Sequence, residues 1–182
     1  MHQPTTQPRP SLYYPYQVFQ PWLPSQHPAQ TRQKVVIAGS GPAGMVAALE
    51  LARHGVASVV LTAELQFSQG SRAIVFTRRS MEILQQVGTA ERMTANGLPW
   101  RFGNSFYRGQ RVFRMEAPHD PDDRFFPLLN IQQQYMEEYL FDACAAHPLI
   151  DFRWGNKVEA VTQREGYAEV RVDTPEGEYT LE

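Results

Sequence analysis

The chain has 182 residues, enough to bury one substantial core. Its 17 basic and 19 acidic residues nearly balance, which gives no electrostatic case for nucleic acid as a partner. The single cysteine, Cys144, excludes a disulfide framework and favours a reducing compartment, so we expect a cytoplasmic protein. No apolar run approaches the roughly 20 residues that span a bilayer, and the histidines lack the spacing of a metal site.

Residues 1–33 differ in composition from the rest of the chain. They contain seven of the 14 prolines, and no acidic residue occurs before Glu50. Proline removes a backbone donor and interrupts helices, so we interpret this segment as an extended or disordered arm. Its aromatic side chains could dock on the folded body or on a partner.

A strand, a helix and a second strand are predicted next. Residues 34–38 form a short apolar run, Gly55 ends the helix, and residues 56–61 are rich in β-branched side chains. Together they occupy about thirty residues, the length of one βαβ unit. Small residues at helical spacing predict a helix face that lies close to the sheet. That face consists of Gly44, Ala47, Ala48 and Leu51.

The turn between the first strand and the helix reads "GSGPAG", a G-x-G-x-x-G pattern. Gly39 permits the tight turn, Gly41 lets a pyrophosphate approach the backbone, and Gly44 lets the helix pack on the sheet. The free N–H groups at the start of the helix would face the phosphates. The predicted dinucleotide-binding residues here are Gly39, Ser40, Gly41, Pro42, Ala43 and Gly44.

The second strand ends without the acidic residue that usually holds a ribose. Thr62 and Ala63 occupy that place, eighteen residues after Gly44. A threonine hydroxyl accepts a hydrogen bond but cannot form a charge-assisted pair. Glu64 could substitute if the loop curls back; the alternative is a solvated loop acid.

Downstream, residues 77–87 and 89–96 are predicted helices, and residues 101–116 a hairpin turning at Arg108-Gly109. Arginines in this hairpin are candidates for a substrate carboxylate or ordinary solvated edge residues. Residues 132–147 are predicted to be helical, with Glu137 away from the apolar face. The segment "IDFRW" is a predicted strand, and the rest alternates like an antiparallel meander.

The order of these elements resembles the FAD-dependent aromatic-ring monooxygenases of the para-hydroxybenzoate hydroxylase and 3-(3-hydroxyphenyl)propionate hydroxylase type. The resemblance rests on "GSGPAG", on "SRA" at residues 71–73, on the helix "RRSMEILQQVG" and on "NIQQQYMEEYLFDAC". It implies an α/β, Rossmann-like FAD-binding fold of three layers, with a parallel sheet, a β-meander and the start of a substrate-covering sheet. Residues 34–182 would be the N-terminal portion of the FAD-binding domain, and residues 101–116 would belong to the substrate sheet.

The resemblance also implies further contacts to FAD. Arg72 matches an arginine that contacts the phosphate-ribose region, and Gln132 matches a glutamine on the flavin side, with Gln134 as the alternative if the register slips. Val158 matches a residue that contacts adenine through its backbone. The family's ribose-binding acid is replaced by Thr62, which makes this the weakest correspondence.

The implied activity is hydroxylation of a small aromatic, phenolic substrate with O₂, with FAD bound and NADH or NADPH as the reductant. No residue stands out as a general acid or base, and the family's later D-G and G-D motifs do not occur. We therefore expect a truncated chain, inactive by itself. Two alternatives stay open: a non-catalytic nucleotide-binding module that works with a partner chain, and another FAD- or NAD(P)-dependent oxidoreductase. A homo-oligomer also stays open.

Overall fold

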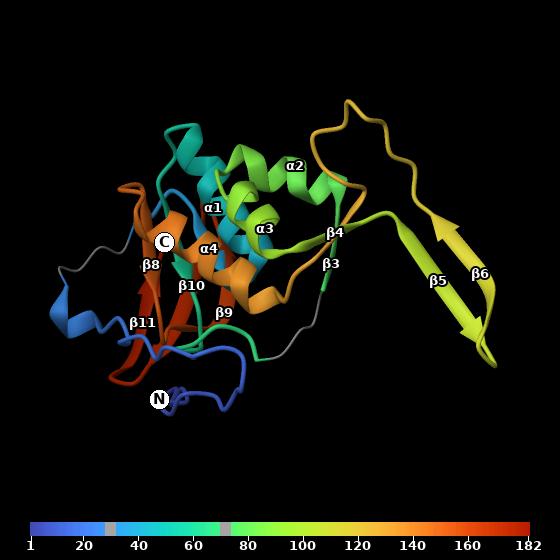
Figure 1. Cartoon of the computed structure of the whole chain (residues 1–182). Helices are drawn as coiled ribbons and strands as arrows, with labels where there is room; N and C mark the ends of the chain where they lie inside the picture. Colours follow the sequence, from blue (N-terminus) through green and yellow to red (C-terminus); the bar gives the residue numbers. More distant parts are fainter. Residues whose placement is uncertain (28–31, 70–73) are drawn as a thin grey trace. The chain divides into compact units, whose positions relative to one another are not determined.

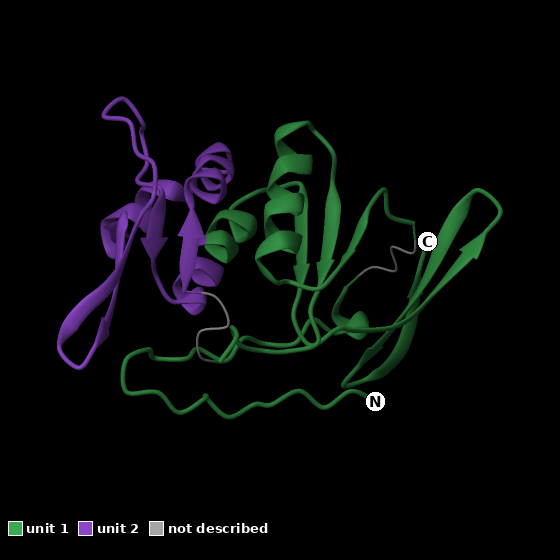
Figure 2. Cartoon of the chain, turned by 90° about the vertical axis from the view of Figure 1, so that its right-hand side faces the viewer, with its two compact units in different colours: residues 1–69, 140–182 green, residues 70–139 purple. Residues whose placement is uncertain are grey.

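The computed structural model describes residues 1–27, 32–69 and 74–182 and divides into two compact units (Figure 2). Unit 1 comprises residues 1–69 and 140–182, and unit 2 comprises residues 70–139. The division falls within helix α4 (Gln133–Ala145). Both units combine helices with sheets, and the predicted α/β class is confirmed.

Unit 1 contains the predicted βαβ unit. Strands β1 (Val36–Ala38), β2 (Ser58–Leu61) and β8 (Ile150–Arg153) form a parallel sheet in the order β1-β2-β8, and α1 (Pro42–Arg53) connects the first two (Figure 1). All four residues of β2 are buried. This explains the continuous apolar run, because the central strand of a parallel sheet is covered on both faces.

The face of α1 that packs inward is displaced from the predicted one. Ala48 is buried as expected, but Ala47 is exposed, and the prediction was wrong at that position. Gly44 lies against the turn, so the buried stripe begins one residue later in the chain. The buried residues of α1 are Met45, Ala48, Leu49 and Ala52.

The predicted meander forms the other covering layer of unit 1. Strands β9 (Lys157–Arg164), β10 (Tyr167–Thr174) and β11 (Gly177–Leu181) pair antiparallel in the order β11-β10-β9. Figure 2 shows α1, the parallel sheet and the meander as successive layers. The core between sheet and meander consists of Val59, Leu61, Val170, Val172 and Leu181.

Cys144 lies in the part of α4 that belongs to unit 1, where it is fully buried. Its Sγ is 3.7 Å from the Met45 carbonyl oxygen, and burial raises the pKa of the thiol to about 12. Because the thiolate is the reactive form, we expect no labelling of the native chain by a thiol reagent at pH 8 and one equivalent in denaturant. Rapid labelling without denaturant would show that α4 opens from α1.

Unit 2 is built on a sheet that the sequence did not reveal. Strands β3 (Val75–Thr77), β7 (Leu128–Asn130) and β4 (Leu98–Trp100) pair antiparallel in the order β3-β7-β4. Helices α2 (Arg78–Gln86) and α3 (Ala90–Asn96) occupy the two predicted helical stretches. Each of these strands has only three residues, too few for a periodic pattern to show.

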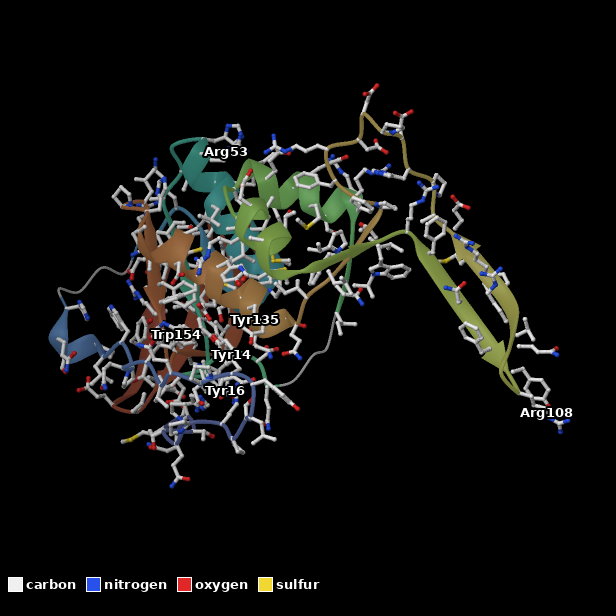
Figure 3. The ribbon with its side chains drawn as sticks, in the orientation of Figure 1. Tyr14, Tyr16, Arg53, Arg108, Tyr135 and Trp154 are labelled. Atoms are coloured by element: carbon white, nitrogen blue, oxygen red, sulfur yellow. The ribbon has the colours of Figure 1, made fainter. Side chains whose placement is uncertain are left out.

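The predicted hairpin consists of β5 (Phe102–Tyr107) and β6 (Gln110–Glu116). Arg108, at its tip in Figure 3, and Gly109 both have positive φ, +47° and +80°. Exposed apolar side chains line both strands, among them Phe106 and Phe113. Within the described ranges, no helix has the length and apolarity to cross a bilayer, and no cluster of three potential metal ligands occurs.

Candidate dinucleotide-binding site

The glycine turn leaves β1 as the motif requires. Gly39 has φ +108°, a left-handed conformation that side chains rarely adopt, and its N–H donates to the Leu61 carbonyl at 2.8 Å. This hydrogen bond places the turn beside the end of β2. The Met45 N–H donates to the Gly41 carbonyl at 3.1 Å, the first bond of α1.

Gly44 and Gly41 are glycines for different physical reasons. A Cβ added at Gly44 would lie 2.1 Å from the Gly39 carbonyl oxygen and 3.2 Å from Ile37 Cγ2, so a side chain would push the helix away from the turn. A Cβ at Gly41 would meet no described atom within 4 Å. Gly41 is therefore open on the side from which a phosphate group can approach the backbone.

The N-terminus of α1 suits an anion. No side chain of the described residues caps this end, where Gly41 is the N-cap and Pro42 follows. Proline has no N–H, so the groups available in the first turn are those of Ala43 and Gly44. Together with the positive end of the helix dipole, they form the donor set that a diphosphate needs. The residues present therefore fit the pyrophosphate of a dinucleotide.

Thr62 follows β2 directly and is held at the carboxyl end of the sheet. It is buried, its N–H donates to the Arg153 carbonyl at 3.1 Å, and its carbonyl accepts the Asn156 N–H at 2.7 Å. Glu64, half-exposed, is paired with Arg9 of the arm, Nη2 to Oε2 at 3.1 Å. The loop acid is thus neither free in solvent nor turned toward Thr62 by any described hydrogen bond.

Asn156 anchors this end of the sheet, and the sequence analysis missed it. Its side chain has no exposed surface; Nδ2 donates to the carbonyls of Trp22 at 2.9 Å and Trp154 at 2.8 Å, and Oδ1 accepts from the Tyr179 hydroxyl at 2.7 Å. The only signal in the sequence is "WGN", in which the turn-forming residues Gly and Asn end a predicted strand. This signal does not reveal that the asparagine side chain is buried.

Arg153 completes the same network from the end of β8. The guanidinium is buried, pairs with Asp151 at 2.6 Å, donates to the Tyr179 hydroxyl at 3.1 Å, and lies 3.9 Å from the Trp22 ring centroid. Burial by itself would lower the pKa of Arg153, but the hydrogen bonds to Asp151 and Tyr179 outweigh it, so the net shift is upward. Arg153 therefore stays charged and fixed, and it joins β8, the meander and the arm.

Val158 lies in β9 close to the end of β2. It pairs with Val172 and packs partly buried on the core. The register changes beside it, because Ala160 pairs with Arg171, which leaves Glu159 without a partner residue on β10. Such a bulge interrupts the ladder and leaves backbone groups for other partners. The glycine turn, Thr62 and Val158 are thus brought together within unit 1.

The remaining predicted residues lie elsewhere. Arg72 is outside the described residues. Gln132 belongs to unit 2, immediately before α4, where it lines a cavity of about 380 Å³ with Asn130 and Tyr135. Its Oε1 accepts from Gln134 Nε2 at 2.6 Å. Of the two glutamines, Gln132 is therefore the one that lines the cavity. Gln134 is buried and donates a hydrogen bond to it.

Two of the hairpin arginines contact the same phenylalanine ring. Arg101 pairs with Glu116 and lies over the Phe102 ring, and Arg114 lies over the same ring at 4.1 Å. The substrate role of these arginines stays a prediction.

Fold and site define a dinucleotide-binding α/β protein, and the comparisons with known proteins are more specific. A family model described as an FAD binding domain matches residues 32–182. The chain is 27% identical over 154 residues to para-nitrophenol 4-monooxygenase of Pseudomonas sp. (strain WBC-3), covering 81% of this chain and 37% of the relative. It is 31% identical over 152 residues to 12-dehydrotetracycline 5-monooxygenase/anhydrotetracycline 6-monooxygenase of Streptomyces rimosus, covering 83% and 29%.

Solved structures agree in fold. The crystal structure of p-nitrophenol 4-monooxygenase from Pseudomonas putida DLL-E4 superposes with a TM-score of 0.76 at 24% identity, over 84% of this chain and 39% of that one. The flavin-dependent monooxygenase PieE, solved with FAD and substrate, gives a TM-score of 0.72 at 28% identity, over 82% and 28%.

The chain belongs to the FAD-binding domain family of the FAD-dependent aromatic-ring monooxygenases, and its cofactor is FAD. The resemblance found in the sequence is thereby confirmed. The chain spans about a third of the length of these two relatives, 37% and 29% respectively.

Proposed function

We propose that this chain is the N-terminal FAD-binding part of a flavoprotein that hydroxylates a small aromatic, phenolic substrate with O₂ and NADH or NADPH. The observation that carries the proposal is the glycine turn, with Gly41 open to solvent and Gly44 closed against Gly39. The relative from Pseudomonas sp. (strain WBC-3) is a para-nitrophenol 4-monooxygenase, which supports the substrate class.

In this proposal the chain binds and orients the cofactor, and FAD supplies the redox chemistry when bound. The N–H groups of Ala43 and Gly44 hold the diphosphate, Thr62 and Ala63 lie beside the adenosine ribose, and the backbone at Val158 borders the adenine. Gln132 offers a donor and an acceptor to the polar part of the flavin half. Arg72 is proposed as a cation for the phosphate-ribose region.

The test is the visible spectrum of the purified chain with and without added FAD. We expect the chain to bind yellow flavin. When the chain is joined to the remainder of the enzyme, we expect NADH or NADPH to bleach this flavin and a phenol to accelerate its reoxidation. A chain that retains no flavin absorbance after incubation with excess FAD and removal of the unbound FAD would contradict cofactor binding. Bound flavin that never responds to a nicotinamide would favour a non-catalytic module.

A further inference from the structure

The N-terminal arm, residues 1–27, is docked on unit 1 by specific contacts, and these lie at the carboxyl ends of the parallel strands (Figure 2). Phe19 N–H donates to the Leu65 carbonyl, and Trp22 N–H to the Trp154 carbonyl, each at 2.9 Å. Nucleotides bind open α/β sheets at this same edge. The matched family region begins at residue 32, so the arm lies outside it.

The loop that follows β2 makes several hydrogen bonds to the arm. Gln66 is buried, and its side-chain amide bonds only arm groups among the described residues: Oε1 accepts the Arg9 N–H at 2.8 Å, and Nε2 donates to the carbonyls of Thr5 and Gln7. Tyr16 donates its hydroxyl to the Ser68 carbonyl at 2.9 Å. Tyr14 and Tyr16, labelled in Figure 3, are both buried although they belong to the arm.

The first residues of the arm reach the predicted adenosine subsite. The His2 ring contacts the Ala63 carbonyl, one residue after Thr62. Arg9 is largely buried, contacts the Phe67 carbonyl and pairs with Glu64. The arm therefore places a cation on the one carboxylate that follows β2 closely, where the family's ribose-binding acid is missing.

We propose that residues 2–9 form the outer wall of the adenosine subsite, and that Arg9 strengthens FAD binding by neutralising Glu64. The diphosphate of FAD is negatively charged, and an unpaired carboxylate two residues beyond Thr62 would repel it. Pairing with Arg9 removes that repulsion and leaves Thr62 and Ala63 to contact the ribose. This inference rests on the proposed function, because it assigns the arm to the same site.

The test compares dissociation constants of the purified full chain for FAD, for ADP, which has only the adenosine half, and for FMN, which lacks it. We expect Arg9→Ala to weaken FAD and ADP about fivefold and to leave FMN unchanged. Adding Glu64→Gln to Arg9→Ala should restore ADP binding, because no charge is left to neutralise. Arg53→Ala is the matched control, since Arg53 pairs with Glu50 at the C-terminal end of α1, away from the glycine turn.

Each outcome decides the inference. Equal ADP affinity in the wild type and in Arg9→Ala overturns the inference and leaves the proposed FAD binding intact. Tighter ADP binding after deletion of residues 2–9 also overturns it, because it shows that the arm occupies the subsite and does not border it. A wild-type chain that binds neither FAD nor ADP removes both the inference and the proposed function. If a variant does not fold, amide hydrogen exchange in residues 2–9 of the wild type serves instead. ADP should slow this exchange and FMN should not, and exchange that ADP leaves unchanged overturns the inference that these residues border the adenosine subsite.

Discussion

Replacing Gly41 by alanine is expected to weaken FAD binding about a hundredfold while the chain stays as stable as the wild type. The backbone of Gly41 has φ −66° and ψ 173°, which alanine adopts without strain, and the added Cβ meets no described protein atom within 4 Å. The methyl group would project into the space that we assign to the pyrophosphate. We therefore expect Gly41→Ala to lower the affinity for FAD without changing the free energy of unfolding.

Gly44→Ala should behave differently, because its Cβ would meet backbone and not open space. The Gly39 carbonyl oxygen would lie 2.1 Å away, and no rotamer change can move it. We expect a loss of about 2 kcal/mol in the free energy of unfolding, the usual effect of overpacking, together with loss of FAD binding. The fold of the turn and the binding of FAD are coupled at Gly44.

Both variants can be measured by urea unfolding followed through tryptophan fluorescence and by titration with FAD. Ala47→Ser is the control, since Ala47 is exposed on the same helix. Unchanged FAD affinity in Gly41→Ala would mean that the phosphates lie elsewhere. Unchanged stability in Gly44→Ala would mean that α1 sits farther from the turn than the structure places it.

The features that the sequence predicted well are local. The glycine turn, the two strands around α1 and the turns of the meander each depend on residues a few positions apart, so their spacing carries the information. The helical face of α1 was misjudged because Gly44 was counted as part of the stripe that faces the sheet. Glu137 was expected on the polar side of α4 but is buried, where its Oε1 accepts from Gln133 Nε2 at 2.7 Å.

The features that the sequence did not predict depend on contacts between distant residues. The pairing of Gln66 with the arm joins residues about sixty positions apart, and neither partner has a pattern that marks it. The composition of residues 1–33 indicates an extended segment, but it does not indicate where that segment docks. The same is true of Arg153, whose charge would ordinarily place it on the surface.

Asn156→Ala is expected to lower the free energy of unfolding by about 3 kcal/mol, because it removes three buried hydrogen bonds, to the Trp22 carbonyl, the Trp154 carbonyl and the Tyr179 hydroxyl. Each of these hydrogen bonds joins a different part of unit 1, respectively the arm, the end of β8 and β11. The position is fully buried, so water cannot replace the amide without entering the core.

The same variant should also loosen the arm, since Asn156 Nδ2 holds the Trp22 carbonyl. We therefore expect faster amide hydrogen exchange in the arm of Asn156→Ala, in addition to the lower urea midpoint. Asn104→Ala, at an exposed position of β5, is the matched control and should change neither measurement. Lower stability with unchanged amide hydrogen exchange in the arm would show that the Asn156 amide supports the meander alone. In that case the arm would be held by Gln66 and the aromatic contacts of Phe19, whose ring stacks on Trp154 at 4.2 Å.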